Sequence, residues 1–328
     1  MQSNTPSSMP LAMKVRAFVK RSPARMAVMI AILLYAFTVI MVPTALNIGA
    51  ISTIFMLTLL LSFASAGQTI VLIGGGLDFT VGAVMSTAAI ITVTIMNAQD
   101  GRFIPALAVV LVFSAAVGIV NGLCTVKIGL PPLIVTLAIA NVVSRLQYVF
   151  TGGSPLGFAG PAFIRTINAR FFTYIPSLTF YALIIFPLVF YILNRSRFGR
   201  QLYLVGNNSE AARLAGIKVN KVKILSYVVS AILAGFTGML GAGYMQSALP
   251  QMFDGYAYNS LIAVIVGGTA FSGGVGSYTG SIAGALVMVV LSNTLTTLNL
   301  SQPIRNIVMG GIMVLLLLMY NRKKAVRQ

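Results

Sequence analysis

The chain has 328 residues, of which 58% are hydrophobic and only 8% are charged. A water-soluble domain carries about 25% charged residues, so this composition excludes a soluble globular protein. Apolar runs of roughly twenty residues recur along the sequence, and each is long enough for a helix to cross a bilayer. We therefore predict an all-α polytopic membrane protein.

The formal net charge is +18, and the chain has no histidine and a single cysteine, Cys124. The basic residues lie in short loops and at both ends, which is how membrane topology is set. We therefore expect a lipid membrane, and no nucleic acid, as a partner. The lack of histidine excludes histidine acid–base catalysis. One cysteine allows neither an intramolecular disulfide nor a metal cluster, and we expect no bound metal.

In chain order, residues 1–25 are polar and basic, and they predict a cytoplasmic tail before a signal-anchor helix. We expect about ten transmembrane helices, at residues 26–42, 48–73, 81–96, 104–126, 133–150, 175–193, 224–245, 258–266, 278–298 and 304–320. Ten crossings put both ends on one side, and a cytoplasmic N-terminus then places most Lys and Arg inside. Residues 26–320 form the transmembrane domain, with a cytoplasmic loop at 194–223 and a cytoplasmic tail at 321–328. The outer loop 151–174 is either an amphipathic surface segment or a plain connector.

Two glycine-rich strings interrupt the apolar runs, at residues 74–82 (GGGLDFTVG) and 266–280 (VGGTAFSGGVGSYTG). Irregular backbone at membrane depth persists only where protein or water satisfies its polar groups. Asp78 is costly near hydrocarbon and is a functional candidate, although with Thr80 it also suits the start of a helix. Both interpretations stay open. We expect both strings near the cytoplasmic face, where the gating and pathway candidates are Gly75, Asp78, Gly82, Gly267, Gly268, Gly273 and Gly274.

The segment 194–223 is the main polar island of the sequence and holds seven Lys/Arg and the chain's only glutamate, Glu210. Asn208 or Ser209 is a good N-cap for a short helix, and Glu210 suits the positive end of that helix. Gly216 is well placed to end it. The island is either a docking element for a soluble partner or an ordinary solvated loop.

The surface of this short helix is predicted to be small and charged. Glu210 and Arg213 are three residues apart, which permits an ion pair on one face. A smooth face that fits a groove on a partner is formed by Ala211, Ala212 and Ala215.

Four motifs, taken together, resemble those of a known family over most of residues 46–320. They are GGGLDFTVG, PPLIVTLAIANVVSRLQYVFTGG, RSRFGRQLYLVGNNSEAARLAGI and IAVIVGGTAFSGGVGSYTG, at residues 74–82, 131–153, 195–217 and 262–280. Because the four motifs occur in the same order as in that family, the chain resembles the permease subunits of bacterial ABC sugar importers of the ribose, xylose and galactose group. That group is part of the branched-chain amino-acid/sugar permease family.

The resemblance implies a vitamin-B12-importer-like (type II) permease fold with ten helices, and it assigns roles to matching residues. The short helix at 208–216 matches the coupling helix that sits in a cleft of the ATPase. The coupling residues are Gly199, Arg200, Gly206, Asn208, Glu210, Ala211, Ala212 and Gly216. The second motif adds two pathway candidates, Thr136 and Arg145. One departure is the absence of an acidic pair before the second glycine string, where Ala257 and Asn259 stand instead.

The resemblance also implies the partners and the place of the chain in the cell. The partners are a second permease subunit (identical or a paralogue), two ATPase copies or one double-length ATPase, and a periplasmic sugar-binding protein. The chain has no G-x-x-x-x-G-K-[ST] string, so it cannot build a phosphate-binding P-loop. We expect it to be no enzyme and to bind no cofactor, with ATP and Mg²⁺ on the ATPase. The location is the bacterial inner (plasma) membrane.

Three other functions are considered as alternatives to a sugar importer. The first is an ABC permease for branched-chain amino acids, and the second is an ion-coupled secondary transporter, which usually has more ionisable groups within the membrane. The third is an intramembrane enzyme. It would have to use acidic residues that are scattered along the sequence, namely Asp78, Asp100, Glu210 and Asp254.

Overall fold

The computed structural model describes residues 22–171 and 174–325, with side chains described as far as residue 315. Most of the predicted tail at 1–25 lies outside these ranges, as do residues 326–328. A helix already begins at Pro23. Residues 321–325, predicted as part of the second tail, continue the last helix of the chain.

The described residues are almost entirely helical. The α-helices are α2 (Pro23–Met41), α3 (Ile48–Ile73), α4 (Val81–Met96), α5 (Phe103–Val126), α6 (Pro132–Thr151), α7 (Pro161–Asn168), α8 (Leu178–Asn194), α9 (Arg197–Asn207), α10 (Ser209–Leu214), α11 (Val219–Met245), α12 (Gly255–Val266), α13 (Tyr278–Thr297) and α14 (Gln302–Ala325). Two 3-10 turns, η1 (Pro43–Ala45) and η2 (Asp100–Arg102), and one antiparallel pair of two-residue strands, β1 (Arg170–Phe171) and β2 (Ile175–Pro176), complete the described part. The predicted all-α class is confirmed.

The predicted number of spans was too high. Within the described residues, six helices are long and apolar enough to cross a membrane, namely α2, α3, α5 together with η2, α6, α11 and α13. The bent pair α8 and α9 raises the number to seven, with a 60° angle between its halves. The apolar helices α4 and α12 have 16 and 12 residues. At 1.5 Å per residue they reach about 24 and 18 Å, short of the roughly 30 Å hydrocarbon core.

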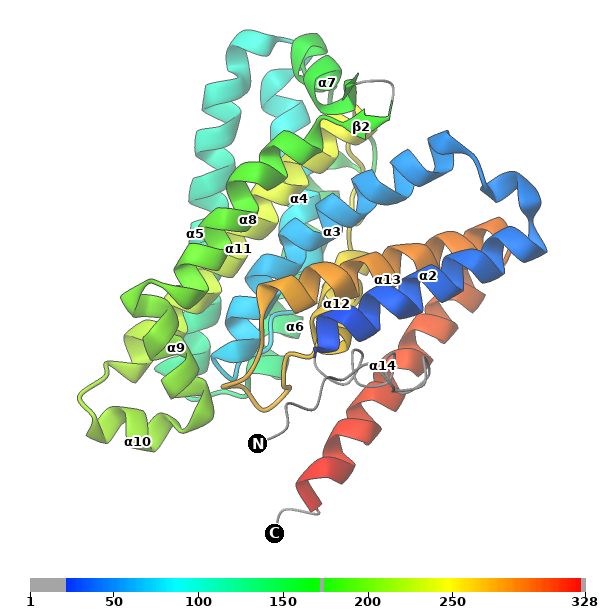
Figure 1. The fold of residues 1–328 in the computed structure, drawn as a ribbon. Helices are drawn as coiled ribbons and strands as arrows, with labels where there is room; N and C mark the ends of the chain where they lie inside the picture. The colour runs from blue at the N-terminus through cyan, green and yellow to red at the C-terminus, as the bar shows by residue number, and fades with distance from the viewer. Residues whose placement is uncertain (1–21, 172–173, 326–328) are drawn as a thin grey trace, which may run out of the picture.

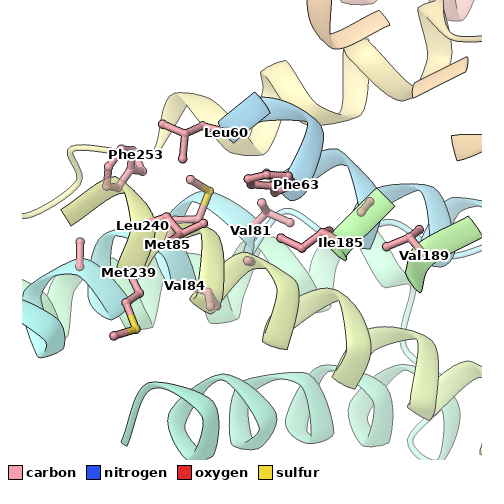
Figure 2. Packing of buried hydrophobic residues seen from close by; sticks show 14 of the residues in the cluster. Leu60, Phe63, Val81, Val84, Met85, Ile185, Val189, Met239, Leu240 and Phe253 are labelled. Atoms are coloured by element: carbon pink, nitrogen blue, oxygen red, sulfur yellow. The ribbon is translucent and has the colours of Figure 1, made fainter. Parts of the chain in front are cut away.

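The helices pack in two groups that share α3 (Figure 1). Helix α11 lies against α3, α4 and α5, whereas α13 lies against α2, α3 and α12. Figure 2 shows the core of the first group, where Phe63 of α3 lies near Met85 of α4 and Leu240 of α11. Contact is close because α11 presents glycine there: a Cβ on Gly238 would lie 2.2 Å from the Met85 carbonyl oxygen.

Helix α7 settles the nature of the loop at 151–174. It is amphipathic, with Phe163 and Ile167 buried four residues apart. The Asp100 carboxylate accepts hydrogen bonds from the Ala162 and Phe163 backbone N–H groups at the start of α7, at 3.0 to 3.2 Å. Helices α7 and α10 lie at opposite ends of the molecule (Figure 1).

Candidate functional site at the end of helix α9

Helix α9 starts where the chain bends after α8. The Ser196 hydroxyl accepts a hydrogen bond from the Gly199 N–H at 3.0 Å and caps the new helix. Gly199 lies inside the bend, since a Cβ there would lie 2.3 Å from the Ile192 carbonyl oxygen. Leu202 and Val205, three residues apart, are buried on one face of α9. The sequence analysis missed this helix, although the Ser196 cap and the apolar spacing were the signals for it.

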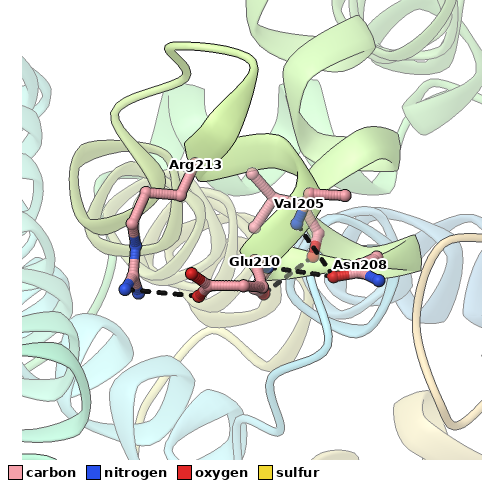
Figure 3. A network of polar contacts seen from close by, with 6 residues as sticks. Val205, Asn208, Glu210 and Arg213 are labelled. Carbon is pink, nitrogen blue, oxygen red and sulfur yellow. Dashed lines mark hydrogen bonds and ion pairs between the residues drawn. The ribbon is translucent and has the colours of Figure 1, made fainter.

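Helix α10 follows at once and lies between the predicted cap at Asn208 and the predicted stop at Gly216. The Asn208 side-chain oxygen accepts hydrogen bonds from the Glu210 and Ala211 N–H groups, both at 3.0 Å (Figure 3). Arg213 and Glu210 form the predicted ion pair at 3.3 Å. Gly216 has a φ of +79°, the left-handed conformation that follows many helix ends. The predictions of the cap, the ion pair and the stop are confirmed.

The predicted smooth alanine face is partly wrong. Ala212 is 4% exposed and packs against the rest of the protein, because it points inward from α10. Ala211 and Ala215 are exposed. The sequence analysis missed Leu214, which is 83% exposed and is the most exposed large apolar side chain of the described residues. The outer face of α10 therefore combines small alanines, one bare leucine and an ion pair.

The end of α9 meets both glycine strings, backbone against backbone. The Gly274 N–H donates a hydrogen bond to the Ile73 carbonyl at 2.8 Å. A Cβ on Gly206 would lie 1.8 Å from that same Ile73 oxygen, and a Cβ on Gly273 would lie 2.9 Å from the Gly75 Cα. Any side chain at these positions would force the backbones apart. We call this convergence of residues 73–75, 206–207 and 272–274 the α9 junction.

A side-chain bond adds to the α9 junction. The Tyr203 hydroxyl of α9 donates to the Gly276 carbonyl at 2.9 Å. Arg200, also predicted as a coupling residue, is exposed, and its guanidinium donates to the Arg195 carbonyl at 2.7 Å. Helix α9 therefore contacts the second glycine string and the end of α3 directly.

The other predicted glycines lie outside the α9 junction. A Cβ on Gly267 would lie 2.3 Å from the Gly280 carbonyl oxygen, where α12 and α13 meet. A Cβ on Gly268 would lie 2.4 Å from the Pro23 side chain at the start of α2. Gly82 lies against the turn before α12, since a Cβ on Gly82 would lie 2.7 Å from the Asp254 carbonyl oxygen. These three glycines fix helix crossings around the junction.

Asp78 lies inside the helix bundle. It is fully buried, and the Ser230 hydroxyl, near the middle of α11, donates to its Oδ2 at 2.9 Å. Its Oδ1 accepts the Thr80 N–H at 2.9 Å and the Thr80 hydroxyl at 2.5 Å. Asn121 of α5 donates to the same Thr80 hydroxyl at 2.9 Å. The network fastens the first string to two neighbouring helices.

The structure bears out the predicted role of Asp78 at a helix start. Thr80 is the N-cap of α4, and the Asp78 carboxylate accepts its backbone N–H. That both strings lie near the cytoplasmic face stays a prediction. The role of Asp78 in gating stays a prediction.

The two candidates from the second motif are not among the residues that meet at the α9 junction. Thr136 is buried, and its hydroxyl donates to the Pro132 carbonyl of its own helix at 2.9 Å. Arg145 is exposed on α6 and acts electrostatically on Asp254. Of the predicted residues, the structure brings together Gly75, Gly206, Gly273 and Gly274, with α10 directly attached.

The fold and the α9 junction define a multi-pass α-helical membrane protein with a basic two-helix extension, α9 and α10, coupled by backbone contact to breaks in its apolar helices. The chain belongs to the family described as branched-chain amino acid transport system / permease component, whose model matches residues 50–317. The predicted relationship to ABC permeases is thereby confirmed.

Several well-described relatives match most of the chain. It is 30% identical to the ribose import permease protein RbsC of Escherichia coli K12 over 292 residues, 86% of this chain and 88% of the relative. Identity to RbsC of Bacillus subtilis 168 is also 30%, over 88% of this chain and 91% of the relative. The galactose/methyl galactoside import permease protein MglC of Escherichia coli K12 is 28% identical over 89% of this chain and 94% of the relative. No solved structure matches.

Proposed function

We propose that this chain is the membrane permease subunit of an ATP-binding-cassette importer for a monosaccharide. The observation that most supports this proposal is the α9 junction, where the exposed helix α10 is linked through α9 to both glycine strings. Sugar as the cargo is supported by the ribose and galactose import permeases among the relatives. A periplasmic sugar-binding protein delivers the cargo, and the chain lies in the bacterial inner membrane with both ends cytoplasmic.

The chain itself is no enzyme, and ATP with Mg²⁺ binds to separate ATPase subunits. Helix α10 is the contact for this ATPase: its exposed Leu214 enters an apolar groove, and Ala211 and Ala215 leave room for close approach. The island of basic residues around α10 keeps it on the cytoplasmic side.

The α9 junction transmits the movement of α10. A force on α10 passes to α9, and at Gly206 it reaches the end of α3 and the string that leads into α13. Since the backbones are already in contact, little displacement is lost in deforming side chains. The ATPase must bind one state of the permease more tightly than the other, because only differential affinity shifts such an equilibrium.

Two permease subunits, either identical or a paralogue pair, form the pathway, with two ATPase copies or one double-length ATPase below them. The gating candidates are the breaks at Gly75, Asp78 and Gly82 and at Gly267 and Gly268. Their movement would open the pathway on one side and close it on the other.

The function is tested by purifying the chain with the products of its neighbouring genes and reconstituting the complex in liposomes. ATP-dependent uptake of ribose or galactose that requires the binding protein is the expected result. ATP-dependent uptake of leucine instead would overturn the sugar assignment. Uphill uptake by this chain alone, driven by an ion gradient, would overturn the ABC assignment.

The coupling role is tested with a matched pair of glycines. Gly216 and Gly129 both have a φ of +79°, and a Cβ on either would have nothing within 4 Å. Gly216→Val and Gly129→Val therefore carry the same backbone strain. We expect similar losses of thermal stability but a loss of sugar-stimulated ATPase activity only in Gly216→Val. Equal ATPase coupling in both variants would remove α10 from the mechanism.

A further inference from the structure

A small polar cavity lies between the start of α4, the middle of α6 and the start of α12. Its volume is about 130 Å³, and its polar and aromatic lining residues are Phe79, Asn141, Ser144, Gln251, Asp254 and Tyr258. Larger cavities of about 580 and 400 Å³ lie elsewhere and are lined mainly by apolar side chains. We call this smaller one the Asp254 cavity.

The Asp254 cavity contains hydrogen-bonding groups that have no partner among the described residues. Ser144 is 5% exposed, and its hydroxyl makes no hydrogen bond to the described residues. The Asp254 Oδ1 is buried and has no partner among the described residues. Because buried polar groups are stabilised by hydrogen bonds, this oxygen is available to accept one from a polar group that enters the cavity.

The cavity lies beside the first glycine string. The Phe253 N–H donates to the Ser86 hydroxyl of α4 at 2.9 Å, which holds the turn before α12 against α4. Phe79, one residue after Asp78, forms one wall and packs edge-on against Tyr258, with ring centroids 5.6 Å apart. The cavity is thus connected to the buried Asp78 network.

The faces around the cavity are unlike a lipid-facing surface. Asn141 and Arg145 are exposed on α6, and Tyr258 is 50% exposed on α12. Polar side chains on apolar helices face a water-filled space or another protein rather than lipid. The cavity is therefore open to a polar space.

We propose that the Asp254 cavity is a contact site for the transported solute and that it binds part of a monosaccharide. The proposal rests on the sugar-permease function proposed above. The Asp254 carboxylate accepts hydrogen bonds from solute hydroxyls, which are strong because the acceptor is charged. Ser144 supplies a further hydroxyl partner. Tyr258 packs against the apolar C–H groups of the sugar ring.

The size and charge of the cavity favour this class of solute. One water takes about 30 Å³ in the liquid, so the cavity holds roughly four such groups and receives one edge of a sugar. Arg145, which lies outside the lining, interacts electrostatically with Asp254. The site therefore favours a neutral polyol over a free cation. It also disfavours an amino acid, because the lining has no cationic side chain to pair with the carboxylate of an amino acid.

Cysteine protection tests the site directly in the reconstituted importer. In a Cys124→Ala background, Ser144→Cys is treated with a charged methanethiosulfonate reagent, with no addition or with ribose, galactose or leucine. We expect labelling that ribose or galactose slows at least several-fold and leucine leaves unchanged. Ile128→Cys, at a 66% exposed position outside both the cavity and the ATPase contact, is the control and is labelled at one rate throughout. No labelling at Ser144→Cys, or labelling that no sugar slows, would overturn the site.

Uptake provides an independent readout. We expect Asp254→Asn to lower sugar uptake about tenfold or more, since a neutral amide with one acceptor oxygen replaces the charged carboxylate, and Asp254→Glu to restore part of it. Ser114→Ala is the control for Ser144→Ala, because Ser114 is also a buried serine but lies on α5, outside the cavity lining. Uptake unchanged in both Asp254→Asn and Ser144→Ala would overturn the site while the sugar function stands. If the wild-type importer transports leucine and leucine protects Ser144→Cys, the sugar assignment of the cavity is wrong.

Discussion

The α9 junction and the Asp254 cavity are built in opposite ways. The junction is made of backbone contacts between glycines, with its hydrogen bonds filled, as between the Gly274 N–H and the Ile73 carbonyl. The cavity is made of side chains, and the Asp254 Oδ1 in it has no hydrogen-bond partner among the described residues. A contact that must transmit movement gains from rigid, complete packing. A site that must take up and release a solute needs unfilled polar groups.

The first glycine string joins the two regions. Gly75 lies at the α9 junction, and Phe79, four residues later, forms a wall of the Asp254 cavity. Between them, Asp78 is fastened to α11 through Ser230. A displacement of Gly75 by the end of α9 therefore reaches Phe79 in the cavity wall through only a few covalently linked residues. One of these, Asp78, is held by α11.

The largest expected effect comes from filling the α9 junction. In Gly206→Ala the new Cβ would lie 1.8 Å from the Ile73 carbonyl oxygen, which is backbone and cannot move aside cheaply. Overpacking of this kind costs about 1–3 kcal/mol, and more where backbone must shift. We expect a large fall in the melting temperature of the purified protein in detergent, or loss of folded protein. Gly310→Ala in α14, where a Cβ meets nothing within 4 Å, is the control, and equal stability of the two variants would contradict the packing described here.

The next effect concerns the anchor between the two regions. Asp78 accepts bonds from Thr80 and Ser230, and the amide of Asp78→Asn would turn an NH₂ group toward one of these donors. A buried donor left unsatisfied costs about 1–3 kcal/mol. We expect that loss of stability in urea or thermal unfolding. Thr92→Val is the control, because Thr92 is equally buried but bonds only the Ala88 carbonyl of its own helix. A smaller loss in Asp78→Asn than in Thr92→Val would show that the anchor does not hold.

Much of the fold was predictable, because apolar runs mark membrane helices directly. The predicted limits 48–73 and 81–96 coincide with α3 and α4. Local rules also predicted α10, since a cap at Asn208 and a stop at Gly216 need only neighbouring residues. The number of spans was wrong, because the short apolar segment 258–266 was counted as a crossing, whereas α12 is too short to cross alone.

The α9 junction and the Asp254 cavity were less predictable, for a physical reason. Gly206 was a candidate through resemblance alone, and nothing local to it predicts contact with Ile73 and Gly274. Asp254 and Ser144 come together only through the tertiary packing of α4, α6 and α12. Each was an isolated polar residue in the sequence, whereas the functional candidates that were found stood in glycine-rich or basic strings.

A smaller effect is expected at the outer surface of α10. Leu214 is 83% exposed, so Leu214→Arg should leave the melting temperature unchanged. If this leucine enters an apolar groove of the ATPase, burying a charge there lowers coupling. We expect about fivefold less sugar-stimulated ATPase activity, equivalent to about 1 kcal/mol. Ile128→Arg, at a 66% exposed position outside the island, is the control. Full coupling in Leu214→Arg would mean that the ATPase binds elsewhere.

The smallest effect separates the two features that hold α10 together. The Glu210–Arg213 pair is 67% and 64% exposed, and such a pair contributes only about 0.2–0.5 kcal/mol to a helix. The Asn208 cap satisfies two backbone N–H groups, and its loss costs about 1 kcal/mol. Hydrogen exchange at Ala211 and Ala212 should therefore be faster in Asn208→Ala than in Glu210→Gln. The reverse order would assign the stability of α10 to its charges, and coupling would then fall steeply with salt instead of depending on backbone contacts as at the α9 junction.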